Sequence, residues 1–473
     1  MLSALLITSF VALWYLPSTR AACQDPSPVF PPPEYKSGDT TILDAFSRVQ
    51  DSLNALTTSP QYNTTSFSIQ VTSSYTTLWS SYHTAREKDS TRPGAERVRG
   101  DSAFRIASIT KTFTTLALLQ LHEAGNLSLD DPVTHYLPRL TGSLPWKNIT
   151  LRILASQLSG IPRDWSQGDL VTQVNDSWRF GLPPPAKHNN DHLPNCYSFS
   201  DDYRPCGEAD LYQAVKHLQP VFAPNFKSTY SNMAFEVLGL VVANASGLKY
   251  EDYIQHRILD VIGMKGSTFK VPPDSVAVLP KGSAWFFDVD EGIHNPTGGL
   301  YSTADDLSVY LRYILTHSNA LATGVNWLQP HSFTFDGGES FYGMPWEIFR
   351  TTKLLNSARS ERPVTFYTKA GGVPGYLSYI IAVPDFGLGF TILVAGEPKE
   401  ISGLVDELRE LVTVPVVRAA EAVAAVQMKE RYDGRFVFER SFDTAEKLNS
   451  SLTLSWDKRE GLTISEFLER SGD

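Results

Sequence analysis

The most informative stretch of this chain is residues 105–125, which read RIASITKTFTTLALLQLHEAG. From Phe113 onward its apolar residues lie on every side of a helix, a pattern typical of a buried helix. Gly125 follows them and suits the left-handed backbone with which many helices end. Ser108 and Lys111 stand three residues apart at the start, so they share one face. The stretch therefore predicts a buried helix that presents a hydroxyl and an amine side by side.

This pair has the chemistry of an activated nucleophile. A serine hydroxyl becomes nucleophilic beside a group that takes its proton, and Lys111 can reach Ser108 without any other element. The helix N-terminus also favours negative charge that develops there. The same spacing recurs at Ser267 and Ser455, but prolines follow Ser267 closely and Ser455 falls in a predicted strand. Ser108 is therefore the predicted nucleophile.

A second triplet, Tyr230-Ser231-Asn232, precedes another apolar helix. The reference pKa values are about 10 for a phenol and about 10.4 for a lysine amine, so both are protonated at neutral pH unless neighbours shift them. Two cations close to Tyr230 would favour its phenolate and make it a general base for Ser108 and later for water. Taken alone, Tyr230 fits an ordinary buried tyrosine better than a general base.

A third triplet, Lys369-Ala370-Gly371, follows a run of alternating residues, and we expect Lys369 to end a strand there. Glycine at 371 and 372 lets a substrate approach the strand edge. The N–H of Gly372 can then pair with the N–H of Ser108 as an oxyanion hole.

The order and contexts of the three triplets resemble the serine β-lactamase and penicillin-binding protein superfamily, class C branch, which includes secreted fungal β-lactamase-like proteins. Two framework segments share the resemblance: LSGIP at residues 158–162 and GGLYSTADDL at residues 298–307. It covers roughly residues 35–430. It implies an α/β fold, an α/β/α sandwich with a central antiparallel sheet and an adjoining all-helical region, with the cleft between them.

The resemblance also implies roles for individual residues, without a metal or another cofactor. The catalytic residues would be Ser108 as the acylated nucleophile, Lys111 as its hydrogen-bonded partner and Tyr230 as acid and base. The substrate-binding residues would be Asn232, Lys369, Gly371 and Gly372. Many β-lactamases have a hydroxyl residue where this chain has Ala370, and that hydroxyl can bind the carboxylate of the drug. The sequence therefore favours an ester, amide or peptide substrate over a β-lactam.

Two alternatives remain open. An acyltransferase would use the same acyl-enzyme with an alcohol acceptor, and the sequence does not separate it from a hydrolase. A non-catalytic secreted binding protein of the same fold would have no need of Ser108, Lys111, Tyr230 and Lys369 together. Metal-dependent and α/β-hydrolase classes are disfavoured, because the chain has no HExxH, HxHxD or GxSxG sequence.

Composition limits the partners. The 473 residues carry a formal net charge of −10, and no basic run is present, so the chain lacks the electrostatic signature of a nucleic-acid binder. We expect a small-molecule or peptide acyl substrate, while the oligomeric state is not predicted.

The N-terminus predicts secretion. Residues 1–15 form an apolar run that is too short to span a bilayer, and small residues at Thr19 and Ala21 suit cleavage of a signal peptide of residues 1–21. Glycosylation is expected at six sequons: Asn63, Asn126, Asn148, Asn175, Asn244 and Asn449. Since Cys23 adjoins the cleavage site, Cys196 and Cys206 are the natural disulfide pair.

The pattern predicts a hydrolase domain at residues 22–430 and a short β-rich extension at 431–473 that either extends the main sheet or is part of a shortened domain. Helices are expected at residues 40–58, 211–218, 233–242, 304–315 and, interrupted at Pro415, 400–428. Strands are expected within residues 66–79 and at 364–368, 377–383 and 389–394. The irregular excursion at 165–207 either walls the cleft or is a glycosylated surface loop.

Overall fold

A computed structural model describes residues 30–165, 204–317, 326–334, 338–355, 362–441, 447–457 and 461–468. The chain divides into a short unit, Met1–Pro31, and a second unit, Pro32–Asp473, and the fold below is that of the second unit. The predicted signal peptide, Cys196 and most of the excursion after Trp165 lie outside the described residues.

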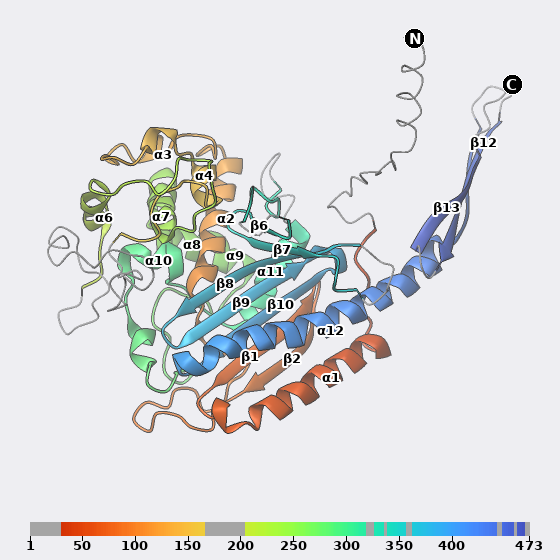
Figure 1. The fold of residues 1–473 in the computed structure, drawn as a ribbon, viewed down its shortest axis with the longest axis horizontal. Helices are drawn as coiled ribbons and strands as arrows, with labels where there is room; N and C mark the ends of the chain where they lie inside the picture. Colours follow the sequence, from red (N-terminus) through yellow and green to blue (C-terminus); the bar gives the residue numbers. More distant parts are fainter. Residues whose placement is uncertain are drawn as a thin grey trace, which may run out of the picture. The chain divides into compact units, whose positions relative to one another are not determined.

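The core of the fold is one eight-stranded antiparallel sheet (Figure 1). Its strands follow the order β2-β1-β10-β9-β8-β7-β6-β5. The strands at one end and in the middle are β1 (Ser66–Ser73), β2 (Thr77–His83), β8 (Val364–Val373), β9 (Tyr376–Val383) and β10 (Leu388–Ala395). The other end consists of β5 (Ser332–Phe333), β6 (Ser340–Tyr342) and β7 (Glu347–Thr351). The three predicted strands after residue 360 are therefore confirmed as the consecutive neighbours β8, β9 and β10.

Two long helices, α1 (Thr40–Thr57) and α12 (Pro398–Tyr432), cover one face of the sheet. Asp39 begins α1, because its side chain accepts a hydrogen bond from the N–H of Thr41 at 3.2 Å. Apolar residues recur every three or four positions on α1 and join an apolar cluster with residues of α12, β1 and β10. The ring of Phe46 stacks on that of Trp79 with 5.6 Å between centroids, which joins α1 to β2.

The interruption expected at Pro415 is wrong, because α12 runs without a break through all 35 of its residues. Proline removes one backbone hydrogen bond from a helix interior. The residues on both sides of Pro415, including Val412, Val416 and Val417, are buried against the sheet, and this packing holds the helix together. Within the described residues, α12 is the one helix long and apolar enough to cross a membrane, but its apolar side covers the sheet.

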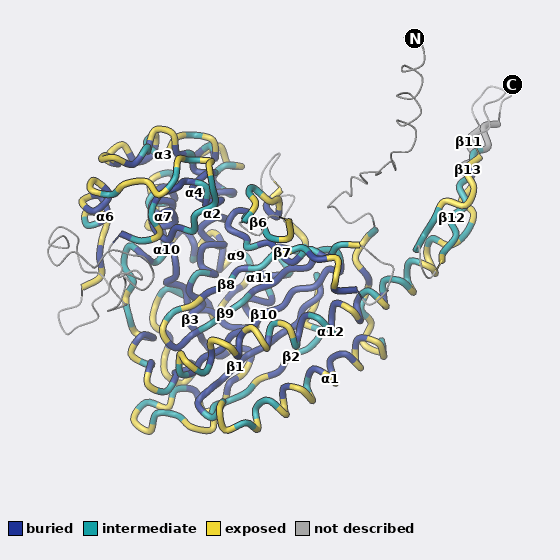
Figure 2. Tube along the Cα trace, viewed as in Figure 1, coloured by how far each residue is buried: buried dark blue, intermediate teal, exposed yellow. Residues whose placement is uncertain are grey.

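The opposite face carries α11 (Ala304–His317) and, beyond it, a helical region. Two buried helices form the centre of this region, α2 (Thr110–Glu123) and α7 (Asn232–Ser246), which pack on each other. Around them lie α3 (Val133–Tyr136), α4 (Leu151–Ala155), α6 (Glu208–Val215), α8 (Tyr250–Ile254), α9 (Asp260–Ile262) and α10 (Asn295–Gly298). Figure 2 shows that α2, β1 and β10 are buried along most or all of their length. This arrangement confirms the expected sandwich with a helical region.

The C-terminal residues form a sheet of their own, with strands β11 (Gly434–Ser441), β12 (Lys447–Asp457) and β13 (Gly461–Leu468). All its described pairings are antiparallel, and none joins the eight-stranded sheet. The expectation that these residues might extend the main sheet is therefore wrong. Whether they belong to a larger domain stays a prediction.

The predicted modification sites divide into two groups. Asn126, Asn148 and Asn244 are exposed, as attachment of a glycan requires. Asn63 is half-buried, and its Nδ2, the atom that a glycan would modify, donates to Glu87 Oε1 at 3.1 Å. Asn175 and the side chain of Asn449 lie outside the described part of the chain. Cys206 is buried, but its predicted partner Cys196 is not described, so the disulfide stays a prediction.

Candidate active site

A tight turn between a short strand and α2 positions Ser108. The strand β3 (Phe104–Arg105) pairs with β4 (Tyr301–Ser302), which lies in the GGLYSTADDL segment. Ala107 then adopts a positive φ of 46°, which is uncommon for a residue with a side chain and stores strain at the turn. Ser108 follows in the single turn η3 (Ala107–Ile109), directly before α2 begins at Thr110. The hydroxyl is thus held at the N-terminal end of a buried helix, and Gly125 ends that helix region with a φ of 73°.

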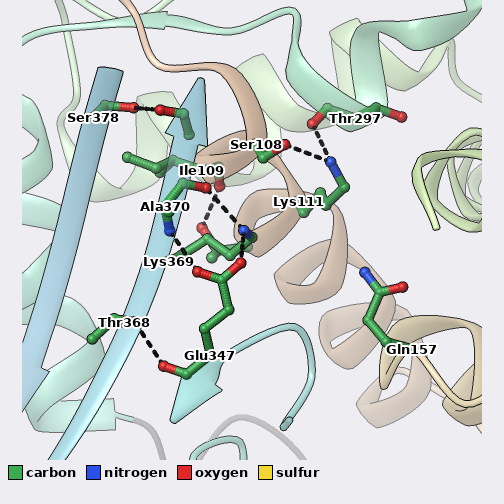
Figure 3. A network of polar contacts seen from close by, with 12 residues as sticks. Ser108, Ile109, Lys111, Gln157, Thr297, Glu347, Thr368, Lys369, Ala370 and Ser378 are labelled. Carbon is green, nitrogen blue, oxygen red and sulfur yellow. Dashed lines mark hydrogen bonds and ion pairs between the residues drawn. The ribbon is translucent and has the colours of Figure 1, made fainter. Parts of the chain in front are cut away.

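Lys111 lies one turn further on and points back to the serine (Figure 3). Its Nζ donates to Ser108 Oγ at 2.8 Å and to the carbonyl oxygen of Thr297 at 2.9 Å. The side chain is fully buried, and burial lowers the pKa of the amine below its usual range, against the attraction of Tyr230. This lysine is therefore placed to exchange a proton with its neighbours.

Tyr230 lies at the N-terminal end of α7, beside both lysines. The Nζ atoms of Lys111 and Lys369 are 5.1 and 5.2 Å from the centroid of its ring. Its phenol lies close enough to Ser108, Lys111 and Lys369 for each of them to influence its pKa. Burial alone would raise the pKa of Tyr230, but the positive charges of the two lysines outweigh it and lower that pKa to about 8. The structure thus brings all three predicted catalytic residues into one cluster.

Hydrogen bonds of Ser231, the residue after Tyr230, fix this segment of the chain. Ser231 accepts a hydrogen bond from the N–H of Ala234 and so begins α7. The N–H of Ser231 donates to Gln157 Oε1 at 2.7 Å, and its hydroxyl donates to the carbonyl of Pro162 at 2.7 Å. Through these bonds, the LSGIP turn and its preceding Gln157 hold the tyrosine in place.

Lys369 forms an ion pair that the sequence did not reveal. Its Nζ lies 2.6 Å from Glu347 Oε1, and the second carboxylate oxygen of Glu347 accepts the N–H of Ala370 at 3.0 Å (Figure 3). Burial would lower the pKa of Lys369, but Glu347 and Tyr230 raise it, so Lys369 stays a cation. The prediction that Lys369 ends its strand is wrong, because β8 continues to Val373 through pairing with β9.

Gly371 lets β8 lie close to the turn that holds Ser108. A Cβ at this position would come within 2.2 Å of the carbonyl oxygen of Ile106, so glycine is required there. Pairing of β8 with β7 ends at Thr368, which leaves the next residues of that edge unpaired by β7. Since alternate N–H groups point to the same edge of a strand, the N–H of Gly372 lies on the edge where the N–H of Ala370 meets Glu347.

Asn232, the last predicted substrate-binding residue, has an internal partner. Its Nδ2 donates to Asp164 Oδ1 at 2.7 Å, and its carbonyl accepts from Thr297 Oγ1 at 3.2 Å. Burial raises the pKa of Asp164, although this bond to Asn232 works against the shift. Asn232 therefore lies beside the cluster, with its amide nitrogen directed to Asp164.

Four residues of this site were not predicted from the sequence: Gln157, Asp164, Thr297 and Glu347. Glu347 had the clearest signal, since it is a single carboxylate in the otherwise apolar run before the Lys369 strand, but its strand was not predicted. Gln157 directly precedes the LSGIP turn, and Asp164 follows it after Arg163. Thr297 acts through its backbone carbonyl, for which residue type gives no signal.

The two other copies of the Ser–Lys spacing lie elsewhere. Ser267 is buried and donates to Asp306 Oδ2 at 2.7 Å, which is a framework contact of the GGLYSTADDL segment. Ser455 lies on β12. Among the described residues, no group of three His, Cys, Asp or Glu side chains is placed to hold a metal ion.

Solved structures share this fold. The chain resembles the crystal structure of a β-lactamase/D-alanine carboxypeptidase from Yersinia pestis, with a TM-score of 0.55 and 20% identity, over 78% of this chain and 98% of that one. A class C β-lactamase matches with a TM-score of 0.55 and 19% identity, over 81% of this chain and 98% of that one. The protein therefore has a class C β-lactamase-like fold.

The sequence profile of the Beta-lactamase family matches residues 46–413, and the chain belongs to that family. A protein named "Probable hydrolase M10" from a Phoma species is 33% identical over 95% of this chain and 73% of its own length. "Probable hydrolase clz13" from Cochliobolus lunatus is 31% identical over 97% of this chain and 75% of its own length. The D-alanyl-D-alanine-carboxypeptidase/endopeptidase AmpH of Escherichia coli is 26% identical over 69% of this chain and 80% of its own.

Proposed function

We propose that this protein is a serine hydrolase that cleaves an ester or amide through an acyl-enzyme at Ser108. The observation that carries the proposal is the 2.8 Å hydrogen bond between Lys111 Nζ and Ser108 Oγ, beside a tyrosine whose pKa falls to about 8. A nucleophile within reach of two candidate bases is what acyl transfer requires. The names of the fungal relatives, both probable hydrolases, agree with this assignment.

In the acylation step, Ser108 Oγ attacks the carbonyl carbon while its proton passes to the Tyr230 phenolate, directly or through Lys111. The oxyanion that forms would accept hydrogen bonds from the N–H groups of Ser108 and Gly372. When the bond to the leaving group breaks, Tyr230 returns the proton to the departing oxygen or nitrogen. Lys369 remains positively charged throughout and favours the phenolate between proton transfers.

In the second step, a water molecule attacks the acyl carbon and gives its proton to Tyr230. The bond to Ser108 Oγ then breaks, and the proton returns to the serine. An alcohol in place of water would complete an acyl transfer by the same route. No contact among the described residues favours an alcohol, so hydrolysis is the function that we propose.

The substrate that we propose is an acyl compound other than a β-lactam. Ala370 offers no hydroxyl to a drug carboxylate, and the N–H of Ala370 is already bound to Glu347. The ammonium of Lys369 is bound to the same carboxylate. The carboxylate of Glu347 thus occupies the place where the resemblance would put the carboxylate of an antibiotic.

Covalent labelling tests the proposal. A fluorophosphonate probe should modify the hydroxyl of Ser108, which peptide mass spectrometry would locate, and Ser108→Ala should abolish the label. Side-by-side assays with p-nitrophenyl esters, D-amino peptides and a chromogenic cephalosporin should show ester or peptide cleavage above cephalosporin cleavage. Adding candidate alcohols reveals whether transfer outruns hydrolysis.

Each outcome has a clear meaning. Absence of label on Ser108 in the folded protein would contradict the proposal and favour a non-catalytic binding protein. Rapid cephalosporin turnover would contradict the substrate assignment. Slow turnover in water that an alcohol accelerates would replace the hydrolase with an acyltransferase.

We further propose that the protein is secreted and glycosylated. The exposed positions of Asn126, Asn148 and Asn244 support this proposal, together with the apolar leader. Expression in a fungal or yeast host should yield a secreted protein that begins after residue 21 and loses mass on treatment with an N-glycosidase. Retention inside the cell, with an intact Met1, would contradict it.

A further inference from the structure

Three cations surround the ring of Tyr230. Besides Lys111 and Lys369, the Cζ atom of Arg163 lies 4.8 Å from the ring centroid. Cations at such distances are attracted to an aromatic ring. The two lysines are fully buried, whereas the side chain of Arg163 is 62% exposed. Arg163 is therefore the cation of this group that a substrate can reach from solvent.

Most donors of both lysines already have partners. An ammonium group has three N–H donors. Two donors of Lys369 meet Glu347 and the carbonyl of Ala370, and its ammonium also lies beside the ring of Tyr230. Two donors of Lys111 meet Ser108 and the carbonyl of Thr297, and its ammonium lies beside the same ring. Each buried lysine therefore has at most one donor left for a substrate anion.

Arg163 has donors to spare. Its Nε lies 3.3 Å from Asp164 Oδ2, and within the described part of the chain the guanidinium donates no hydrogen bond. A guanidinium carries five N–H donors in a planar fork that matches the two oxygens of a carboxylate. The Nη side of Arg163 is thus available for a bidentate contact.

The backbone of Arg163 is fixed although its side chain is exposed. Its carbonyl oxygen accepts the N–H groups of Asn232 at 2.8 Å and of Met233 at 3.1 Å, which are free donors of the first turn of α7. The next residue, Asp164, accepts the side chain of Asn232. The arginine is therefore attached to the same helix start that carries Tyr230, and a preorganised contact costs less free energy on binding.

We infer that Arg163 is a specificity-determining residue that binds a carboxylate on the acyl part of the substrate. The inference rests on the proposed function and names its substrate class: acyl compounds with a free carboxylate several bonds from the scissile carbonyl. Lys369, neutralised by Glu347, leaves this task to Arg163. The acyl carbon would sit at Ser108. Lys111 contacts both Ser108 and the ring on which Arg163 stacks, so one extended acyl chain can reach from Ser108 to Arg163.

A matched pair of esters tests the inference. Mono-p-nitrophenyl adipate and p-nitrophenyl hexanoate have acyl chains of equal length and differ in a terminal carboxylate. The ratio of their kcat/KM values is the readout, because changes at Tyr230 affect both esters alike. We expect the native protein to prefer the adipate and Arg163→Gln to lower the ratio about tenfold, mainly through KM. Arg163→Lys should restore part of it, and added salt should reduce it.

Arg139 provides a control. Its Cζ lies 4.4 Å from the ring centroid of Tyr212, its Nη1 lies 3.4 Å from Glu208 Oε1, and its side chain is 66% exposed. It is thus an arginine stacked on a tyrosine and paired with a carboxylate, as Arg163 is, but outside the cluster around Ser108. Arg139→Gln should leave the ratio unchanged.

The outcomes separate this inference from the proposed function. If the native protein cleaves neither ester and Ser108 takes no label, the proposed function fails. If it cleaves both but prefers the hexanoate, or if Arg163→Gln lowers both rates equally, Arg163 does not select a carboxylate while the hydrolase assignment stands. An unchanged ratio in Arg163→Gln would overturn the inference in the same way.

Discussion

Single charges around Tyr230 decide the chemistry of this site. Lys111 and Lys369 lower the pKa of the phenol, and Glu347 raises it. Glu347 also keeps Lys369 protonated through its ion pair. A change of one pKa unit corresponds to about 1.4 kcal/mol, so each of these residues can move the pH range of activity measurably.

The first prediction concerns pH. In the proposed mechanism the active base is the Tyr230 phenolate, so kcat/KM for a neutral ester should be low below pH 7 and should rise with an apparent pKa of about 8. Glu347→Gln removes a negative charge that raises this pKa, so its profile should shift to lower pH. Glu339→Gln, at an exposed carboxylate paired loosely with Lys353 at 3.9 Å, should not shift it. A native profile that shows no titration near pH 8 would contradict the role of Tyr230 as base.

The second prediction distinguishes Ser108 from Ser267, the buried serine of another copy of the Ser–Lys spacing. Ser108→Ala should lower kcat by about 10⁴-fold or more while leaving the folded structure intact. Ser267→Ala removes a hydrogen bond to buried Asp306 and should cost about 1–3 kcal/mol of unfolding free energy, with kcat retained. Steady-state kinetics and chemical denaturation of both variants provide the comparison. Loss of activity in Ser267→Ala without loss of Ser108 labelling would count against this assignment.

At the scale of elements, the site depends on how closely β8 approaches the turn before α2. The carbonyl oxygen of Ile106 lies only 2.2 Å from the position that a Cβ of residue 371 would take. The same oxygen accepts a hydrogen bond from the hydroxyl of Ser378 on β9 at 3.0 Å. A strand and a helix from distant parts of the sequence are thus positioned against each other by one carbonyl group.

The third prediction follows from that approach. Gly371→Ala should push β8 away from the turn, because its Cβ would lie 2.2 Å from a backbone oxygen that cannot rotate aside. Displacing the N–H of Gly372 from the oxyanion should lower kcat/KM about a hundredfold. Near-native kinetics in Gly371→Ala would show that the oxyanion hole does not include β8.

The fourth prediction concerns a glycine that, unlike Gly371, has room for a side chain. Gly403 lies exposed within α12, and an added Cβ there would meet nothing within 4 Å. Gly403→Ala should therefore raise the unfolding free energy by about 0.5–1 kcal/mol through helix propensity and leave kcat/KM unchanged. Chemical denaturation measures the gain, and a destabilised variant would mean that α12 is not continuous at this point.

Local patterns predicted α2, α7, α11 and the neighbours β8, β9 and β10, because apolar periodicity and turn residues act over a few positions. They did not reveal β5, β6 and β7, which are short and half-buried and pair at the end of the sheet. The ion pair of Glu347 with Lys369 was missed for the same reason, since it forms across two paired strands. At Pro415, packing on the sheet outweighed a local rule that breaks isolated helices.

At the scale of the whole molecule, two apolar cores lie on opposite faces of the sheet. One joins α1 and α12 to β1 and β10, and the other joins α2, α7 and α11. The candidate site lies where strands of the sheet meet the helices of the second core. Among its described residues, none comes from the C-terminal sheet of β11, β12 and β13.

The fifth prediction concerns that C-terminal sheet. It exposes large apolar side chains, including Phe436, Ile464 and Phe467. A variant that stops after Tyr432 should keep kcat/KM within about threefold and should associate less in solution, because the exposed apolar area is removed. Kinetics and sedimentation of both forms decide this. Loss of activity with an unchanged thermal midpoint would mean that the C-terminal sheet contributes to substrate binding.

The carbonyl of Ile106 ties the reactive serine to β8 and β9, which lie in the interior of the eight-stranded sheet. A serine that is fixed to the interior of a sheet in this way stays in place until the sheet itself unfolds. On heating, activity should therefore be lost at the same temperature at which the protein unfolds cooperatively. An enzyme whose nucleophile lies on a separate mobile segment loses activity several degrees below its unfolding temperature.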